Sequence, residues 1–327
     1  MKADGADARW MASAIALSSR AQPTSNPNPN VGCVIVRAGR VVGHGWTAAG
    51  GRPHAEAMAL AMAGDGARGA QAYVTLEPCA HDSARGPSCA ASLIAAGIAQ
   101  VRAAMLDPDP RTHGRGMAML AAAGVICDVG TGADGARAAM APWLCRQTLG
   151  RAHVTLKLAT SLDGQIARAD GESRWITGER ARAHAHMLRA RSDAILVGRG
   201  TLDADRPRLD VRLNGLEDRR PRRILLSSGE DAPDGWEIAA SADAAAQMPG
   251  VHALLVEGGA GAAAAFIAAD LVDTLILYRA PILLGRGRAA LADIGLASLA
   301  EAHGRWRCTD IRRLGDDIFE RYERIRG

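Results

Sequence analysis

Pro53-His54-Ala55-Glu56, followed by Glu77-Pro78-Cys79 and then by Cys89, is the part of the sequence that decides the fold of the first half of this chain. One imidazole and two thiolates are ligands that hold a catalytic zinc ion and leave its fourth position for water. A glutamate two residues after the histidine carries protons in the H-x-E and P-C pattern of zinc deaminases. The residues therefore predict a zinc site at His54, Cys79 and Cys89, with Glu56 moving protons while an amino group leaves a nucleobase-like ring.

The segments around these residues alternate between helix and strand patterns. Helical periodicity covers 8–20, 54–63, 88–96, 116–123 and 133–144, and β-rich runs cover 31–36, 40–46, 72–76, 101–105 and 126–129. This order predicts an α/β layered domain. It places His54 and Glu56 in the first turn of one helix and Cys89 in the first turn of another, where thiolates and developing negative charge are favoured.

Composition limits the size and the partners of the protein. With 327 residues, of which 48% are hydrophobic, the chain suits two domains of roughly 150 residues each. The net charge of +4 is spread along the chain and only 3% of the residues are aromatic, so a basic patch and stacking platforms for nucleic acid are missing. We expect a small anionic substrate and no nucleic acid.

Cysteine usage and hydropathy predict the compartment. The six cysteines show no compact disulfide spacing, and two of them are needed as metal ligands. The first residues lack a basic region followed by a long apolar run, and no segment approaches the length of a membrane-spanning helix. We expect a reduced cytoplasmic protein without a signal peptide or a membrane segment, and a homo-oligomer, either a dimer or a tetramer.

The pattern restarts near residue 150, which divides the chain into domains 1–149 and 150–327. Strands are predicted at 154–159, 194–197, 222–226, 252–256 and 274–278, helices at 179–191 and 262–268, and an antiparallel pair at 305–314 and 318–323. A glycine-rich turn, Gly258-Gly259-Ala260-Gly261, leads from a buried strand into a helix and could cradle a phosphate. Thr177 is expected to cap the helix that follows it. Taken alone, these patterns indicate a phosphate-binding α/β domain in the second half of the chain.

Several motifs in both halves resemble one enzyme family. NPNPNVGCVIV (26–36), PHAEAMAL (53–60) and TLEPCAH (75–81) resemble the deaminase half of the bifunctional riboflavin-biosynthesis deaminase/reductase family. LKLATSLDGQIA (156–167), GESRWITG (171–178), the stretch 188–209, LLVEGGAG (254–261) and the stretch 271–285 resemble its reductase half. The resemblance implies a cytidine-deaminase-like α/β/α layer domain followed by a dihydrofolate-reductase-like α/β domain.

The resemblance also implies two consecutive reactions. The first is hydrolytic deamination of 2,5-diamino-6-hydroxy-4-(5-phosphoribosylamino)pyrimidine at the zinc-activated water, with one Zn²⁺ per deaminase domain. The second is reduction of the ribosyl group of 5-amino-6-(5-phosphoribosylamino)uracil to a ribityl chain by NADPH. A small phosphorylated pyrimidine is thus the implied partner of both sites.

The family motifs also assign residues of this sequence. Lys157 and Asp205 are the expected catalytic residues of the reductase half. The residues that match cofactor-binding positions are Ala159, Trp175, Thr201, Asp205, Ser228, Gly259, Ala260, Gly261, Ala262, Ala263, Ala264 and Ala265. The residues that match substrate positions are Ser173, Arg189, Leu209, Arg212 and Glu257, and Asn28 in the proline-flanked segment before the first strand is a further substrate candidate. His81 and Arg85 lie in the loop between the two cysteines and could also contact substrate.

Three departures and two alternatives accompany this interpretation. The Cys79–Cys89 loop is one residue longer than usual in the family, Ala260 replaces a usual proline, and the stretch between Arg212 and Val251 is short. A zinc deaminase of tRNA or nucleosides with a non-catalytic nucleotide-binding second domain would also explain the zinc motif, but it leaves the second half idle. A non-catalytic regulatory protein is disfavoured by the intact ligand set with Glu56.

Overall fold

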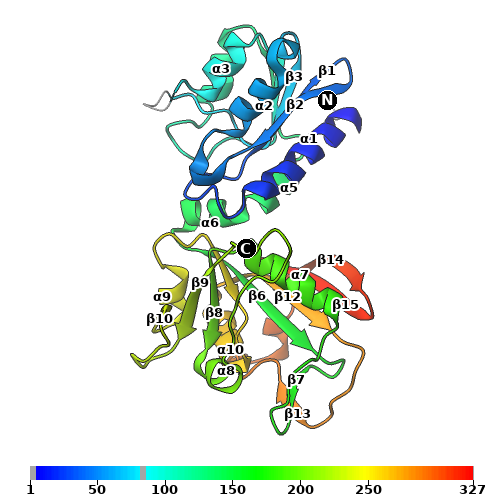
Figure 1. The fold of residues 1–327 in the computed structure, drawn as a ribbon, viewed down its shortest axis with the longest axis vertical. Coiled ribbons are helices and arrows are strands. Elements are labelled where there is room, and N and C mark those ends of the chain that lie inside the picture. The colour runs from blue at the N-terminus through cyan, green and yellow to red at the C-terminus, as the bar shows by residue number, and fades with distance from the viewer. Residues whose placement is uncertain (1–4, 82–85, 327) are drawn as a thin grey trace. The chain divides into compact units, whose positions relative to one another are not determined.

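The computed structural model describes residues 5–81 and 86–326, and its chain forms two compact units, Met1–Gly150 and Arg151–Gly327 (Figure 1). Each unit is built around a sheet of its own with helices against it. The predicted fold class, two successive α/β domains, is confirmed. Among the described residues, no helix is long and apolar enough to cross a bilayer.

The sheet of the first unit has five strands in the order β2-β1-β3-β4-β5. The strands are β1 Gly32–Arg37, β2 Arg40–Trp46, β3 Gln71–Val74, β4 Gln100–Ala103 and β5 Ile126–Val129. β1 runs antiparallel to β2 and β3, whereas β3, β4 and β5 are parallel. β1 and β2 form a hairpin that turns at Ala38 and Gly39, both of which have positive φ angles.

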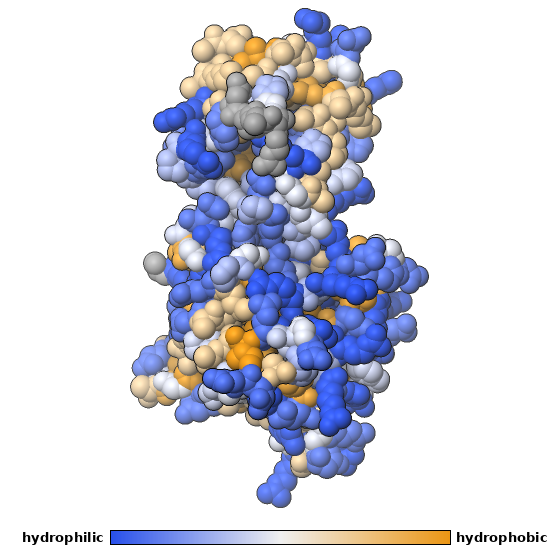
Figure 2. Space-filling view, turned by 60° about the vertical axis from the view of Figure 1, so that its left-hand side comes forward, coloured by the Kyte–Doolittle hydropathy of each residue, from blue (hydrophilic) through white to orange (hydrophobic). Residues whose placement is uncertain are grey.

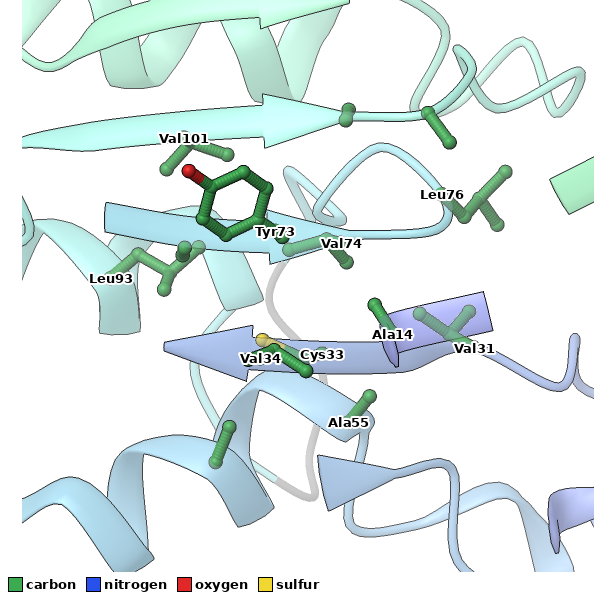
Figure 3. Packing of buried hydrophobic residues seen from close by; sticks show 14 of the residues in the cluster. Ala14, Val31, Cys33, Val34, Ala55, Tyr73, Val74, Leu76, Leu93 and Val101 are labelled. Atoms are coloured by element: carbon green, nitrogen blue, oxygen red, sulfur yellow. The ribbon is translucent and has the colours of Figure 1, made fainter. Parts of the chain in front are cut away.

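Helices cover this sheet and enclose a core of small aliphatic side chains. They are α1 Gly5–Ser18, α2 Ala55–Ala63, α3 Cys89–Ala95, α4 Arg115–Ala122, α5 Ala133–Ala139 and α6 Ala141–Leu149. The single helix expected over 133–144 is therefore two helices, which meet at Met140. Figure 3 shows part of the core, in which Val34, Tyr73 and Leu93 pack with Cys33 and Ala55.

Two glycines of β2 set the position of α2, and with it the position of the zinc motif. A Cβ atom on Gly43 would lie 2.2 Å from the carbonyl oxygen of Ala59, and one on Gly45 would lie 2.4 Å from the carbonyl oxygen of Ala55. Only residues without a side chain allow the helix backbone to approach the strand this closely. The small residues of β2 therefore fix the distance between the sheet and the helix that follows His54.

The second unit contains an eight-stranded sheet in the order β10-β9-β8-β11-β6-β12-β15-β14. The strands are β6 His153–Thr160, β8 Ala194–Gly198, β9 Arg222–Leu226, β10 Trp236–Ala239, β11 Ala253–Val256, β12 Val272–Arg279, β14 Trp306–Leu314 and β15 Asp317–Arg324. The strands from β10 to β12 are parallel, and β12, β15 and β14 are antiparallel. A separate antiparallel pair joins β7 Gln165–Arg168 to β13 Gly287–Ala289.

The helices of the second unit are α7 Glu179–Ala190, α8 Arg199–Asp205, α9 Ala242–Ala246 and α10 Ala260–Ala268. The prediction that Thr177 caps α7 is wrong: Gly178 holds the cap position, and its N–H donates to Asp317 Oδ2 over 2.7 Å. The cap residue of α7 is thus bonded to β15, far along the chain. On the face drawn in Figure 2, hydrophobic residues form small groups among hydrophilic ones.

Because β6, β8 and β11 are parallel neighbours or near neighbours in the sheet, their carboxyl ends lie at the same edge. These ends are Thr160, Gly198 and Val256. Open α/β sheets bind ligands beyond the carboxyl ends of their strands. The loops predicted to hold the cofactor start at this edge, so the topology places them together.

Candidate active sites

Three different elements bring the predicted metal ligands together in the first unit. His54 is the cap residue of α2, with an extended backbone, so it lies one residue before the first turn in which it was expected. Cys79 lies in the loop after β3, and Cys89 is the first residue of α3. Ser88 caps α3 by accepting the N–H of Ala91 over 3.3 Å, which fixes the start of the helix that carries Cys89.

The distances within this group fit a tetrahedral zinc ion. His54 Nδ1 lies 3.2 Å from Cys89 Sγ and 3.8 Å from Cys79 Sγ, and all three ligand atoms lie within 4.8 Å of one another. Zinc bonds of about 2.0 Å to nitrogen and about 2.3 Å to sulfur place tetrahedral ligands about 3.5 Å apart. The donor set therefore matches zinc in chemistry and in spacing, with a fourth position left for a non-protein ligand.

The surroundings of Cys79 favour its thiolate. A hydrogen bond from the Cys89 thiol, together with those from His54 and from the Cys89 backbone N–H, lowers the pKa of Cys79 to about 4 even though burial opposes this. The Cys89 N–H donates to Cys79 Sγ over 3.3 Å at the start of α3, where the helix dipole also favours negative charge. A thiolate is the form that binds metal.

Glu56 and Asn28 lie beside the ligands. The Glu56 side chain is 3% exposed, and burial raises its pKa, with the charge of Cys79 adding to the effect while His54 opposes it. Glu56, His54, Cys79 and Asn28 line the same small cavity of about 40 Å³. Gly51 approaches Asn28 so closely that a Cβ atom there would lie 1.8 Å from the amide nitrogen, which holds the Asn28 side chain against the loop before His54.

The loop between the two cysteines is described only in part. His81 is exposed, and Arg85 lies outside the described residues. Asp107, which the sequence did not single out, lines the cavity on another side, and burial raises its pKa.

Glu77 is a second buried carboxylate, and sequence reasoning missed its role. It is 3% exposed and accepts backbone N–H groups from Asp107, Gly114, Gly116 and Met117 over 2.9 to 3.2 Å. A carboxylate with several N–H donors at a helix start is strongly held. Glu77 therefore ties the loop before Cys79 to the start of α4, and it positions Asp107 rather than taking part in proton transfer.

In the second unit, three predicted residues form one charged network. Glu257 follows β11 and accepts two hydrogen bonds from Arg189 of α7, over 2.7 and 2.8 Å. Lys157 of β6 lies with its Nζ 3.8 Å from Glu257 Oε2. Burial would raise the pKa of Glu257, but the Arg189 hydrogen bonds and the Lys157 charge outweigh it and hold that pKa below its ordinary value. The network thus holds an ionised carboxylate between two cations.

The network extends to the other predicted substrate residues. Arg189 Nη1 also donates to the carbonyl oxygen of Asp210, over 3.1 Å. Asp210 lies between buried Leu209 and Arg212, and its carboxylate pairs with Arg212 over 3.0 Å. Leu209 and Arg212 are therefore linked to Arg189 through the backbone and side chain of a residue that the sequence did not select.

The predicted cofactor residues meet at the strand ends. Thr201 Oγ1 accepts the N–H of Gly259 over 2.8 Å, which joins the start of α8 to the glycine-rich turn before α10. A Cβ atom on Gly258 would lie 2.7 Å from Ala262 Cβ, so the turn needs a glycine there. Ala260 and Gly261 lie inside the first turn of α10, which extends the expected helix by two residues.

Other assigned residues are placed less centrally. Arg174 donates to the carbonyl oxygen of Asp205 over 2.7 Å, and Trp175 is 66% exposed beneath the Arg182 guanidinium. Ala159 lies in β6 two residues after Lys157. Within the described residues, no hydrogen bond or ion pair connects Ser173 or Ser228 to the Lys157–Glu257 network.

Tyr278 is a neighbour of Lys157 that the sequence did not indicate. It is buried in β12, its ring centroid lies 5.9 Å from Lys157 Nζ, and its hydroxyl shares a 2.7 Å hydrogen bond with His184 Nδ1. Burial raises the pKa of Tyr278 and lowers that of His184. Only the pairing of β12 with β6 reveals this contact, because the two residues are far apart in the chain.

Comparisons with known proteins match both units of the chain. A family model of the cytidine and deoxycytidylate deaminase zinc-binding region matches residues 5–105, and a model of the RibD C-terminal domain matches residues 152–319. The riboflavin biosynthesis protein RibD of Haemophilus influenzae is 38% identical, with 95% of this chain and 96% of that protein covered. The RibD protein of Escherichia coli is also 38% identical, with 95% and 98% covered.

Solved structures match over nearly the whole chain as well. A RibD structure from Acinetobacter baumannii has a TM-score of 0.84 at 35% identity and covers 98% of this chain and 99% of its own. A deaminase/reductase from Thermotoga maritima, described as acting on diaminohydroxyphosphoribosylaminopyrimidine and 5-amino-6-(5-phosphoribosylamino)uracil, has a TM-score of 0.87 at 27% identity with the same coverage. Both similarities span the two units of this chain.

Proposed function

Because this chain belongs to the family of bifunctional riboflavin-biosynthesis deaminase/reductases, we propose that residues 1–149 deaminate 2,5-diamino-6-hydroxy-4-(5-phosphoribosylamino)pyrimidine and that residues 150–327 reduce the product. The chain is an enzyme of riboflavin biosynthesis with a deaminase activity and a reductase activity. The observation that carries the assignment to the two halves is the presence of a zinc donor set with a buried glutamate in one unit and a charged network at the strand ends of the other.

In the deaminase site, His54, Cys79 and Cys89 would hold the metal, and Glu56 carries protons. Zinc, when bound, supplies a Lewis acid that lowers the pKa of coordinated water. Glu56 lies in the same cavity as the ligands and is shielded from solvent, so it can move one proton of the water to the ring nitrogen and the second to the departing amino group. Asn28 has an amide that can donate to and accept from the ring edge, and it orients the pyrimidine.

In the reductase site, NADPH supplies the hydride, and the protein orients the substrate. Addition of hydride to the first ribose carbon must be accompanied by one proton for the opened sugar. Lys157 has an ammonium group beside the ionised Glu257, so it can donate hydrogen bonds to the ribose oxygens, and Asp205 at the end of α8 is proposed to assist it. Arg189, held by Glu257, remains charged and suits the anionic arm of the substrate.

For the cofactor, the proposed contacts are Thr201 and the Gly259–Ala265 segment, together with Ala159, Trp175 and Ser228. Ser173, Leu209 and Arg212 are proposed to contact the substrate together with Arg189 and Glu257. We further propose that the enzyme acts in the cytoplasm as a homo-oligomer, in keeping with the phosphorylated substrate and the intracellular supply of NADPH.

A coupled assay tests the proposal. The purified, zinc-loaded protein is incubated with the diaminopyrimidine phosphate, with and without NADPH, and the products are separated by chromatography. Without NADPH, the aminouracil with an intact ribosyl group should accumulate, and with NADPH it should be converted to the ribityl compound. Release of ammonia without any later NADPH oxidation would support the deaminase assignment and contradict the reductase assignment.

A further inference from the structure

Arg199 connects the carboxyl ends of two neighbouring parallel strands in the second unit. It follows β8 as the first residue of α8 and is half-buried. Its Nη2 donates to Ser227 Oγ over 3.2 Å and to the carbonyl oxygen of Asp231. Ser227 comes directly after β9, so the guanidinium group is held across the ends of β8 and β9.

This position lies next to the proposed cofactor contacts. Thr201 is two residues further along α8 and binds the N–H of Gly259, and Ser228 is the neighbour of Ser227. All three strand ends, those of β8, β9 and β11, face the edge at which ligands of open parallel sheets bind. Arg199 is therefore a cation that the chain connectivity places beside this set.

The space beside Arg199 is suited to an anion. A cavity of about 580 Å³ is lined by Arg199 with Arg206, Arg208 and Arg223, and by the two carboxylates of Asp203 and Asp231. The arginines outnumber the carboxylates, so the cavity has a net positive charge. Within the described residues, the hydrogen bonds of Arg199 use only Nη2, which leaves Nη1 and Nε able to donate to a ligand.

NADPH differs from NADH only by a phosphate on the adenosine 2′ oxygen, and in dinucleotide-binding folds a nearby arginine accommodates this group. We propose that Arg199, oriented by Ser227, binds the 2′-phosphate of NADPH and gives the reductase its preference for NADPH over NADH. A guanidinium fork matches the geometry of a phosphate, and its orientation by Ser227 reduces the entropy lost on binding. This inference rests on the proposed reductase function and adds to it the residue that selects the cofactor.

The experiment compares binding of NADPH and NADH to the full-length, zinc-loaded protein by titration calorimetry. Arg199→Ala should weaken NADPH binding roughly 10- to 100-fold, the cost of one charge-assisted interaction, and change NADH binding less than about threefold. The matched control is Arg223→Ala, which removes another arginine of the same cavity. Arg223 lies in β9, and its guanidinium carbon is 5.6 Å from the centroid of the Trp236 ring. This control should keep the ratio of the two affinities.

The outcomes separate the inference from the proposed function. An unchanged ratio of NADPH to NADH affinity in Arg199→Ala overturns the inference, as does an equal loss of NADPH binding in Arg223→Ala. Equal weakening of both dinucleotides in Arg199→Ala, with an unchanged circular dichroism spectrum, also overturns it. If the unaltered protein binds neither dinucleotide, the proposed reductase function itself fails. Retained deaminase activity shows in each case that the first unit is intact.

Discussion

Glu56 and Glu77 are two buried carboxylates beside the same metal ligands, and their hydrogen-bond partners give them opposite tasks. Glu77 accepts four backbone N–H groups, two on each oxygen of its carboxylate. Glu56 lines the cavity, and burial raises its pKa toward the range in which a carboxyl group can exchange protons. The difference between a catalytic and a positioning carboxylate here is therefore the number of N–H groups that point at it.

Replacing Glu56 by glutamine should abolish deamination and spare reduction. The amide keeps the shape of the side chain but cannot accept a proton, and loss of a general acid–base typically costs 10²- to 10⁴-fold in rate. Ammonia release and NADPH oxidation are measured on the same preparation, with aminouracil substrate supplied for the second reaction. Deamination at the original rate in a zinc-loaded Glu56→Gln protein would refute the role of Glu56.

At the scale of the element, close backbone approaches decide where the metal ligands lie. The start of α4 packs on the Glu77-Pro78-Cys79 loop, and a Cβ atom on Gly116 would lie 1.9 Å from the carbonyl oxygen of Pro78. A sequence pattern predicts α4 but not what touches its first turn. The loop that carries Cys79 is thus held by α4, which comes later in the chain. The Gly116 N–H donates to Glu77, and the lack of a side chain on Gly116 lets the helix approach the Pro78 carbonyl.

Gly116→Ala should therefore destabilise the first unit by about 1–3 kcal/mol, because the added methyl group forces the helix away from the Pro78 carbonyl. The control is Gly66→Ala in the same unit, where a Cβ atom would meet only the Val42 side chain at 3.6 Å. Urea unfolding, followed together with zinc content, measures the difference. Equal free energies of unfolding for the two variants would show that the approach of α4 to Pro78 is not limiting.

A second prediction at this scale concerns the strands β6 and β12. Arg151 forms a two-pronged pair with Asp273 over 2.8 and 2.9 Å, and the Val154 N–H donates to the same carboxylate over 2.8 Å. Burial raises the pKa of Asp273, but the Arg151 hydrogen bonds outweigh it, so the pKa in the folded state lies below the ordinary value. The pair consequently stabilises the fold above about pH 4, and this stabilisation is lost as the pH falls through the lowered pKa.

Asp273→Asn should cost about 3 kcal/mol at pH 7, because it removes the buried negative charge that pairs with both Arg151 and Arg326. The cost should shrink as the pH falls below about 4, because the unfolded chain then binds a proton at Asp273 and the advantage of the charged form in the folded protein decreases. Unfolding of the two proteins by urea at pH 7 and at pH 3 is the measurement. A cost that stays constant between pH 7 and pH 3 would show that the charge of Asp273 does not contribute.

At the scale of the whole molecule, the two units have separate cores. One buried cluster is composed only of residues between Met11 and Trp143, and the others only of residues from Ala152 onward. Each core holds one site: the zinc donors in the first and the Lys157–Glu257 network in the second. A change that affects one core should therefore leave the chemistry of the other unaltered.

Removing the metal tests this separation. The purified protein should contain one zinc per chain, and treatment with a chelator should lower the unfolding temperature of the first unit while NADPH binding persists, because metal binding adds to the stability of the unit that holds it. Cys89→Ser should reproduce the loss of zinc. Differential scanning calorimetry and elemental analysis are the measurements. Loss of NADPH binding together with zinc would contradict separate cores.

The sequence by itself determined most of the strands and helices in both units and the residue types of the candidate zinc site, but it did not indicate α8, α9, β7, β10 or β13. Local patterns carry this information, because a helix or strand leaves its period in the apolar residues and because zinc chemistry needs His and Cys beside a glutamate. The errors were local too: His54 lies at the cap and not in the first turn, and the 133–144 helix is broken at Met140.

Only the tertiary structure decided which groups meet across the sheets. Several contacts join residues that are distant in the chain: the bond from Gly178 to Asp317, the four N–H groups on Glu77, the contact of Lys157 with Glu257 and Tyr278, and the bridge from Arg199 to Ser227. No local propensity records such contacts, because they depend on strand order and on the closeness of two backbones. The zinc motif could thus be predicted from the chain alone, whereas the groups that hold and tune it required the fold.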